Sequence, residues 1–347
     1  MPLMPRWSFS DRYPMNKHKN IPIFVPHAGC PNDCVFCNQR KISGKTEFDP
    51  DTVPFEIERA LATIPSECEV EIAYFGGSFT GIEPSLMLRL LKIAASYVES
   101  GWVQSIRLST RPDFIDEKIL EILKAHYVKT VEIGFQSLDD GVLRASRRGH
   151  SAADSYNAAR LIKQYGFELV GQMMTGLPGS SVDKEIFTAS EICRMGADAA
   201  RIYPTVVFYD TALCDMAKSG EYLPLTLEQS VNSAYEVYKV FSAGGVEVIR
   251  CGLCAADNLF DEGTVYSGGY HEALGELVES RVMYDKIVKA LGQNAQKEIN
   301  ITVAPGMTSR AVGHKKINKQ ILREDFGITK MKVTESRELG GFEVRIN

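Results

Sequence analysis

Short apolar runs alternate with helix-like stretches between about residues 20 and 210, and this alternation limits the folds open to the chain. Glycine and proline turns separate the segments. The strand candidates are residues 21–26, 70–77, 105–110, 130–137, 168–176 and 199–207, and the helix candidates include 84–100, 116–127 and 152–166. Strands interleaved with helices predict an α/β fold with a parallel sheet. Polar residues and glycines follow most of these strands, so we expect the active site at their carboxyl ends.

The pattern changes after about residue 225. Residues 227–244 and 274–292 have helical spacing, and residues 300–306 then predict a strand. A helix over 309–327 and a hairpin of 328–335 with 341–347 complete the expected pattern. We therefore predict a parallel α/β domain over 1–225 and a helical and α+β C-terminal extension over 226–347.

The net charge of -5 argues against a globally basic nucleic-acid binder, but the charge is unevenly distributed. Residues 301–347 hold nine Lys and Arg against five Asp and Glu, while the first 300 residues hold thirty against thirty-nine. The basic tail is consistent with chance drift or with a surface for a phosphate-bearing partner. The sequence has no run of eighteen apolar residues and its first twenty residues lack an apolar signal core, so we expect a cytoplasmic protein without membrane contact.

Three of the eight cysteines lie within eight residues, as Cys30, Cys34 and Cys37. Thiols of a cytosolic protein stay reduced, so this crowding favours a metal site over disulfides. Four thiolates usually hold a [4Fe–4S] cluster, and three would leave one iron open for chemistry. The alternative is a structural Cys₃His zinc site with His27 or a distant histidine as the fourth ligand.

A CxxxCxxC motif with an aromatic residue, Phe36, before its last cysteine resembles the radical S-adenosylmethionine (SAM) superfamily. The resemblance implies a partial (β/α)₆ barrel and a [4Fe–4S] cluster on Cys30, Cys34 and Cys37, with SAM on the open iron. It further implies reductive cleavage of SAM to methionine and a 5′-deoxyadenosyl radical, which abstracts hydrogen from the substrate. An external one-electron donor of the flavodoxin or ferredoxin kind is expected as a partner.

Other segments extend the resemblance over roughly residues 20–225. The loop with Gly76, Gly77 and Ser78 is similar to the family's Gly-Gly segment, which pairs with the methionine moiety of SAM. Five segments most closely resemble the radical SAM domain of Elongator subunit 3, and more distantly the oxygen-independent coproporphyrinogen oxidases. These segments are residues 109–113, 134–137, 147–150, 173–179 and 201–205.

That closer resemblance implies individual contacts to SAM. Gln136, Arg148 and Gln172 would face SAM, with Arg148 pairing its carboxylate and Gln172 reaching the ribose hydroxyls. Phe36 and Met174 would flank the adenine.

The chain also departs from the Elongator subunit 3 pattern. Its cysteine spacing is narrower, and Ser109 stands where relatives tend to carry Glu. The residues after the barrel show no evident CoA-binding pattern, so the acetyltransferase domain and its carboxymethylation chemistry are not expected. Three functions stay open: a radical SAM enzyme acting on RNA, particularly a tRNA base; one acting on a tetrapyrrole or another metabolite; and a non-catalytic zinc-binding, RNA-associated module.

Three features of the second half have a functional and a structural interpretation. Cys251 and Cys254 could bind an auxiliary metal or form a buried pair. Glu276, Glu279 and Arg281, with His271 nearby, could contact substrate or form a solvated helix face. The basic run from Gly313 to Lys319 could contact RNA phosphates or simply be exposed to water.

Overall fold

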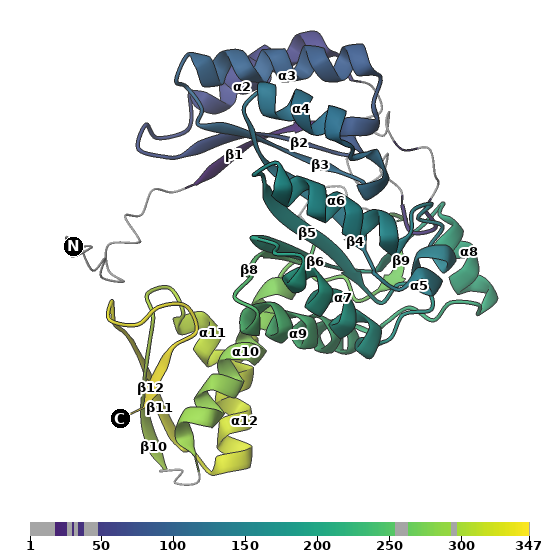
Figure 1. The fold of residues 1–347 in the computed structure, drawn as a ribbon. Coiled ribbons are helices and arrows are strands. Elements are labelled where there is room, and N and C mark those ends of the chain that lie inside the picture. The colour runs from purple at the N-terminus through teal and green to yellow at the C-terminus, as the bar shows by residue number, and fades with distance from the viewer. Residues whose placement is uncertain are drawn as a thin grey trace, which may run out of the picture. The chain divides into compact units, whose positions relative to one another are not determined.

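The computed structural model describes residues 18–25, 30, 34–37, 48–253, 263–292 and 297–346. Its main feature is a seven-stranded sheet with the order β1-β2-β3-β4-β5-β6-β8 (Figure 1). The strands are β1 (Lys19–Phe24), β2 (Val70–Phe75), β3 (Ser105–Thr110), β4 (Val128–Gln136), β5 (Glu168–Thr175), β6 (Ala199–Pro204) and β8 (Glu247–Cys251). All six predicted strands are present, and the α/β fold is confirmed. The seventh strand, β8, pairs in parallel with β6.

Helices occupy the stretches between the strands, as the sequence predicts. They are α2 (Val53–Leu61), α3 (Pro84–Glu99), α4 (Glu117–Ala125), α5 (Asp140–Ala145), α6 (Ala152–Gln164), α7 (Val182–Arg194), α8 (Ala212–Ser219), α9 (Leu227–Ala243), α10 (Leu274–Leu291), α11 (Thr308–Val312) and α12 (Ile317–Phe326). Side-chain caps define several starts. Asp116 accepts a hydrogen bond from the Ile119 amide at α4, and Thr226 with Gln229 forms a capping box at α9.

The predicted strand 199–207 is divided in two. β6 ends at Pro204, and β7 (Val206–Phe208) pairs instead with β9 (Val265–Gly268) in a separate antiparallel ribbon. Periodicity alone gave no sign of this break, because residues on both sides of it are apolar.

The chain divides into two compact units that are interleaved along the sequence. Unit 1 comprises Met1–Pro31, Gln39–Gly134 and Ala153–Val170, and unit 2 comprises Asn32–Asn38, Phe135–Ala152 and Gly171–Asn347. The domain boundary expected after residue 225 stays a prediction.

Within unit 1, a buried charge cluster joins three neighbouring strands. Arg107 donates to Glu71 at 2.7 Å and to Glu132 at 3.0 Å, and all three side chains are buried. His18 and Ser105 also hydrogen-bond to Glu71, at 2.8 and 2.5 Å. Burial alone would raise the pKa of Glu71, but these hydrogen bonds and the Arg107 charge outweigh it and lower the pKa to about 2.

The C-terminal part of unit 2 differs from the predicted strand, helix and hairpin. Strands β10 (Glu298–Val303), β11 (Lys330–Glu335) and β12 (Val344–Ile346) form a sheet in the order β11-β10-β12. β11 runs parallel and β12 antiparallel to β10, so the expected hairpin is wrong. β10 is the central strand of this sheet because its alternate residues Ile299, Ile301 and Val303 are buried in a shared core with α10, α11 and α12. The single helix expected over 309–327 is also wrong, since it is broken at Gly313.

In the part of the chain that the structure describes, no helix combines the length and the apolar character needed to cross a membrane.

We predict that Arg107→Ala lowers the free energy of unfolding by about 3–5 kcal/mol, because two buried carboxylates then lose the guanidinium that they share. Urea unfolding at pH 7 measures this loss. Lys129→Ala is the control, since Lys129 pairs with Glu168 at 3.1 Å in an exposed position and should cost no more than about 1 kcal/mol.

The free energy of unfolding that Arg107→Ala loses should also depend on pH. Because the folded pKa of Glu71 is depressed, its stabilisation is present above its unfolded pKa and disappears as the pH falls towards 2. The gap between wild type and Arg107→Ala should therefore narrow between pH 5 and pH 3. Equal losses in both variants, or a gap that widens on acidification, would contradict the assignment.

Candidate active site

In unit 1, the carboxyl ends of β1 and β2 approach closely at Gly76. The Val25 amide donates to the Phe75 carbonyl at 2.8 Å. A Cβ on Gly76 would lie 2.6 Å from the Val25 carbonyl oxygen and 2.8 Å from the Phe24 ring, and its φ of +115° also requires glycine. The first glycine of the predicted Gly-Gly segment is therefore needed for the strand ends to meet.

The same region brings Cys30 to Ser78. The Cys30 Sγ and the buried Ser78 Oγ are 3.5 Å apart. Behind this loop, the Thr80 hydroxyl bonds to the Thr110 hydroxyl at 2.6 Å and donates to the Phe114 carbonyl at 2.9 Å. The loop after β2 is thus held by buried hydrogen bonds, with Ser78 beside the first predicted cluster ligand.

In unit 2, the segment with the other two cysteines is anchored through Val35. Its amide donates to the Ser146 carbonyl at 3.2 Å, and its carbonyl accepts from the Leu213 amide at 2.8 Å. The Val35 side chain packs in a small core, and Phe36 packs against that core while staying partly exposed. The Cys37 amide closes a turn on the Cys34 carbonyl at 3.0 Å. Cys34 and Cys37 therefore lie on a segment that protein contacts hold in place.

Arg148 lies beside one of these cysteines. Its side chain is buried, and Nη1 lies 3.3 Å from the Cys34 Sγ. Hydrogen bonds to sulfur are among the factors that set the potential of iron–sulfur clusters. Arg148 was predicted to pair with the SAM carboxylate, and the structure adds a contact with a predicted cluster ligand that spacing did not reveal.

Gln136 ends β4 in an unusual conformation. It has a φ of 65°, in the left-handed region that residues other than glycine rarely adopt. Its buried Oε1 has no hydrogen-bond partner among the described residues. Buried polar atoms without partners are costly, and strained backbone is frequent at ligand sites. Both observations fit the predicted contact of Gln136 with SAM.

Gln172 and Met174 share one face of β5. Both are half-buried, whereas Gly171, Met173 and Thr175 are buried. Alternate residues of a strand point to the same side, so the two predicted SAM-facing side chains lie together. This register is what their predicted roles require.

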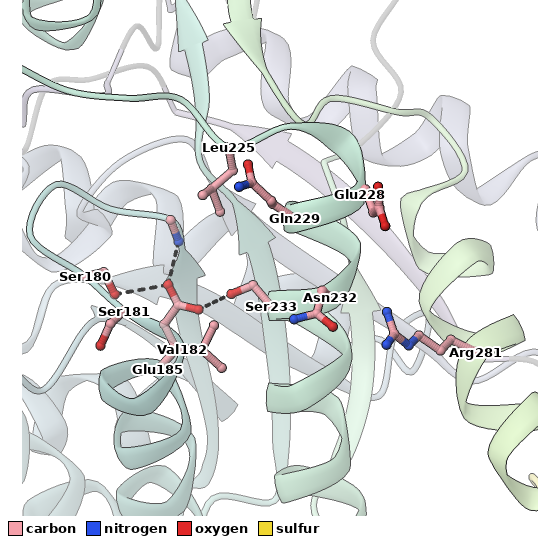
Figure 2. Close-up of a pocket in the computed structure, with 11 residues that line it drawn as sticks. Ser180, Ser181, Val182, Glu185, Leu225, Glu228, Gln229, Asn232, Ser233 and Arg281 are labelled. Carbon is pink, nitrogen blue, oxygen red and sulfur yellow. Dashed lines mark hydrogen bonds between the residues drawn. The ribbon is translucent and has the colours of Figure 1, made fainter. Parts of the chain in front are cut away.

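A cavity of about 420 Å³ lies next to the end of β5 in unit 2 (Figure 2). Glu185 on α7 lines it and accepts hydrogen bonds from the Gly176 amide at 2.6 Å, from Ser180 at 3.0 Å and from Ser233. Burial raises the pKa of Glu185, although these donors oppose the shift. The volume lies in the range of small-ligand sites.

The cavity was not foreseen. It is lined by none of the eight residues predicted to contact SAM. Glu185 and Ser233 come from helices whose sequences show only ordinary amphipathic spacing, so no local signal marked them. Arg281 also lines the cavity and lies over the Tyr235 ring at 4.6 Å, while Glu279 pairs with Arg310 at 2.9 Å.

Among the described residues, no three His, Cys, Asp or Glu side chains are grouped as metal ligands. Cys30, Cys34 and Cys37 therefore stay a predicted ligand set. His27 and Cys254 lie outside the described residues. Burial and the charge of Glu279 raise the pKa of Cys251 to about 12, as in an unreactive thiol.

Comparison with known proteins decides the family. A model of the radical SAM superfamily matches residues 24–188, and a model of the radical SAM C-terminal domain matches residues 197–284. The chain belongs to the radical SAM superfamily. The cofactors of this superfamily are a [4Fe–4S] cluster and SAM. The chemistry of the donors fits them, because three thiols are available and hydrogen-bonding groups lie beside two of the sulfurs.

Individual relatives show which radical SAM proteins this chain is similar to. It is 35% identical over 130 residues to a tRNA uridine(34) acetyltransferase of Methanocaldococcus infernus, covering 36% of this chain and 24% of the relative. It is 32% identical over 120 residues to human Elongator complex protein 3, covering 34% of this chain and 22% of the relative. The chain thus spans about a quarter of the length of these relatives.

The fold comparison agrees. The solved structure of Elp3 from Methanocaldococcus infernus superimposes with a TM-score of 0.60 at 23% identity, covering 78% of this chain and 63% of that one. The similarity confirms the partial-barrel radical SAM fold.

We predict that Gly76→Ala lowers the melting temperature far more than Gly101→Ala. Both glycines have a positive φ, +115° and +77°, but a Cβ on Gly101 meets nothing within 4 Å. Backbone strain of about 1–3 kcal/mol is common to both variants, and only Gly76→Ala adds the collision with Val25. Calorimetry of both proteins measures the difference, and equal shifts would show that the close approach of β1 and β2 is unimportant.

Proposed function

We propose that this radical SAM enzyme holds its [4Fe–4S] cluster through Cys30, Cys34 and Cys37. The observation that supports this most is the contact of Ser78 and Arg148 with two sulfurs of the CxxxCxxC motif, at 3.5 and 3.3 Å. When bound, the cluster supplies the electron that cleaves SAM into methionine and a 5′-deoxyadenosyl radical. The fixed Val35 anchor keeps two of the thiols in position without help from the metal.

We propose that SAM is bound by residues at the carboxyl ends of the strands. The backbone of Gly76, Gly77 and Ser78 would face the methionine moiety. Gln136 would donate or accept a hydrogen bond through a carboxamide whose oxygen has no protein partner among the described residues. In addition, Arg148 would pair with the SAM carboxylate, and Gln172 would reach the ribose hydroxyls. Phe36 and Met174 would flank the adenine.

We propose RNA, and tRNA in particular, as the substrate. Support comes from the names of the relatives, tRNA uridine(34) acetyltransferase and Elongator complex protein 3, and from the basic residues of the C-terminal segment. The acetyltransferase activity in the first name is not part of the proposal, because the similarity covers only a quarter of that protein. A flavodoxin-like or ferredoxin-like protein would supply the electron, and the enzyme would act in the cytoplasm.

A small-molecule substrate is the second candidate, and the cavity around Glu185 favours it. Its volume of about 420 Å³ suits a metabolite, and its lining contributes both donors and acceptors. Radical formation that is stimulated by a metabolite and unaffected by RNA would favour this candidate.

We predict that Cys34→Ala abolishes 5′-deoxyadenosine formation. After anaerobic reconstitution, wild type should bind about four irons per chain and release 5′-deoxyadenosine from SAM with dithionite, because three thiolates hold the cluster. The control is Cys193→Ala, which removes a half-buried thiol on α7 and should leave both quantities unchanged. Zinc without iron or sulfide, or equal activity of Cys34→Ala and Cys193→Ala, would overturn the proposed cluster.

We also predict that Gln136→Gly weakens SAM binding about tenfold while the fold gains or keeps stability. Glycine adopts a φ of 65° without strain, and the lost carboxamide removes one or more hydrogen bonds to the ligand. Isothermal titration of the reconstituted protein with SAM measures the affinity, and thermal unfolding measures stability. Unchanged affinity would exclude Gln136 from the SAM site.

A further inference from the structure

The C-terminal residues of unit 2 form a compact β-α-α-β arrangement. Strand β10 leads into α11, a four-residue loop from Gly313 to Lys316 follows, and α12 then returns the chain to β11. The helices α10, α11 and α12 lie beside the three strands (Figure 1). Helices and strands share a buried core. The loop therefore joins two helices that pack on one sheet.

The loop backbone is held in an uncommon conformation. Gly313, Lys315 and Lys316 have φ values of 83°, 50° and 66°. A Cβ on Gly313 would lie 2.7 Å from the Asn318 amide nitrogen, so only glycine fits there. The buried Asn318 side chain donates to the Ser280 carbonyl at 2.8 Å and to the Arg310 carbonyl at 3.0 Å, which ties the loop to α10 and α11. Two consecutive left-handed lysines persist because this framework holds them.

The side chains of the loop create a positively charged hollow. A cavity of about 320 Å³ is lined by Ser309, Arg310, His314, Lys315 and Lys316, with Glu276 as an acidic member. Glu279 already neutralises Arg310 at 2.9 Å. Lys315 and Lys316 are exposed, and neither makes an ion pair within the described residues. Their charge is thus available to an anionic ligand.

Two histidines extend this surface. The His314 ring contacts the His271 ring edge to face, with 5.6 Å between centroids. Flat side chains next to lysines suit a single-stranded nucleic acid, since bases stack on rings while phosphates pair with ammonium groups. A sulfate-like anion would use only the charges, whereas an RNA strand would use both features.

We infer that the Gly313–Lys316 loop binds the sugar-phosphate backbone of single-stranded RNA, so that residues 298–335 form an RNA-holding module. KH modules clamp about four nucleotides with a glycine-led four-residue loop of this kind. The fourth position of that loop is glycine in KH modules and Lys316 here, in the left-handed conformation that glycine favours. The inference deepens the proposed action on RNA and rests on it.

The test compares two charge reversals of equal size in the full-length, reconstituted enzyme. Lys315→Glu/Lys316→Glu alters the loop, and Lys286→Glu/Lys289→Glu alters two exposed lysines on α10. The probe is a fluorescein-labelled, unstructured 20-nucleotide RNA of mixed sequence, followed by fluorescence anisotropy. The loop variant should bind at least tenfold more weakly than wild type, and the α10 variant within about twofold.

Salt dependence adds a second readout. A plot of log affinity against log salt becomes less steep by about 0.7 for each phosphate contact to a single strand that is lost. The loop variant lacks two lysines, so its slope should be smaller in magnitude than that of wild type by about 1.4. Equal weakening in both variants, no RNA binding by wild type at 50 mM salt, or tighter binding of the matching duplex would each overturn the inference. Thermal unfolding checks that both variants are folded, and Lys315→Gln repeats the test with a milder change.

The proposed radical chemistry is judged separately. Formation of 5′-deoxyadenosine without RNA should be the same in wild type and both variants, because neither lysine pair belongs to the proposed SAM site. Its absence in all three proteins would contradict the proposed function, while the anisotropy results would still decide the role of the loop.

Discussion

The parallel pairing of β1 with β2 is the constraint on which the candidate site in unit 1 depends. Their register places Ile21 opposite Ile72 and Phe24 opposite Phe75, so both strands end at the same level. The loop that carries Cys30 and the loop that carries Ser78 therefore start side by side. Two atoms that are 48 residues apart in sequence meet at 3.5 Å for this reason. Gly76 is the residue that permits the approach, because any side chain would collide with the Val25 carbonyl.

The buried polar groups that the structure describes are of two kinds, those whose hydrogen bonds other protein groups satisfy and those that have an atom without such a partner. In unit 1, Glu71 receives hydrogen bonds from three side chains, and its neighbour Arg107 is shared with Glu132. Such a satisfied network favours one strand register over others. In unit 2, by contrast, the buried Gln136 Oε1 and the hydroxyls of Thr175 and Thr205 have no partner among the described residues. Groups of the second kind cost stability unless a ligand completes them, which is why they point to binding rather than to folding.

Much of the fold could be predicted from the sequence because its signals are local. Strand candidates such as 105–110 coincide with β3, since the apolar Ile106 and Leu108 alternate with polar residues in a segment that turns flank. The site was predictable only through the motif and the family resemblance, and the contacts of Cys34 with Arg148 and of Cys30 with Ser78 depend on tertiary packing. Three features could not be predicted from the sequence because they depend on tertiary packing or on the backbone conformation of one residue. The strand pairing of β10 depends on core packing, the break at Gly313 depends on a positive φ, and Glu185 becomes buried only when α7 packs against α9.

Similar reasoning applies to Lys315 and Lys316 in the C-terminal part of unit 2. Their left-handed backbone is costly, and it too points to binding. Lys315 and Lys316 would have ordinary helical φ values if residues 309–327 formed the single helix that the sequence predicts. The structure instead keeps a tight loop, with Asn318 buried beneath it and both ammonium groups exposed. Backbone strain of this kind is concentrated at sites that bind ligands. The first 300 residues carry a net negative charge, and Lys315 and Lys316 make no ion pair with any residue that the structure describes. The two lysines therefore provide a local site at which a polyanion can be held despite the overall repulsion.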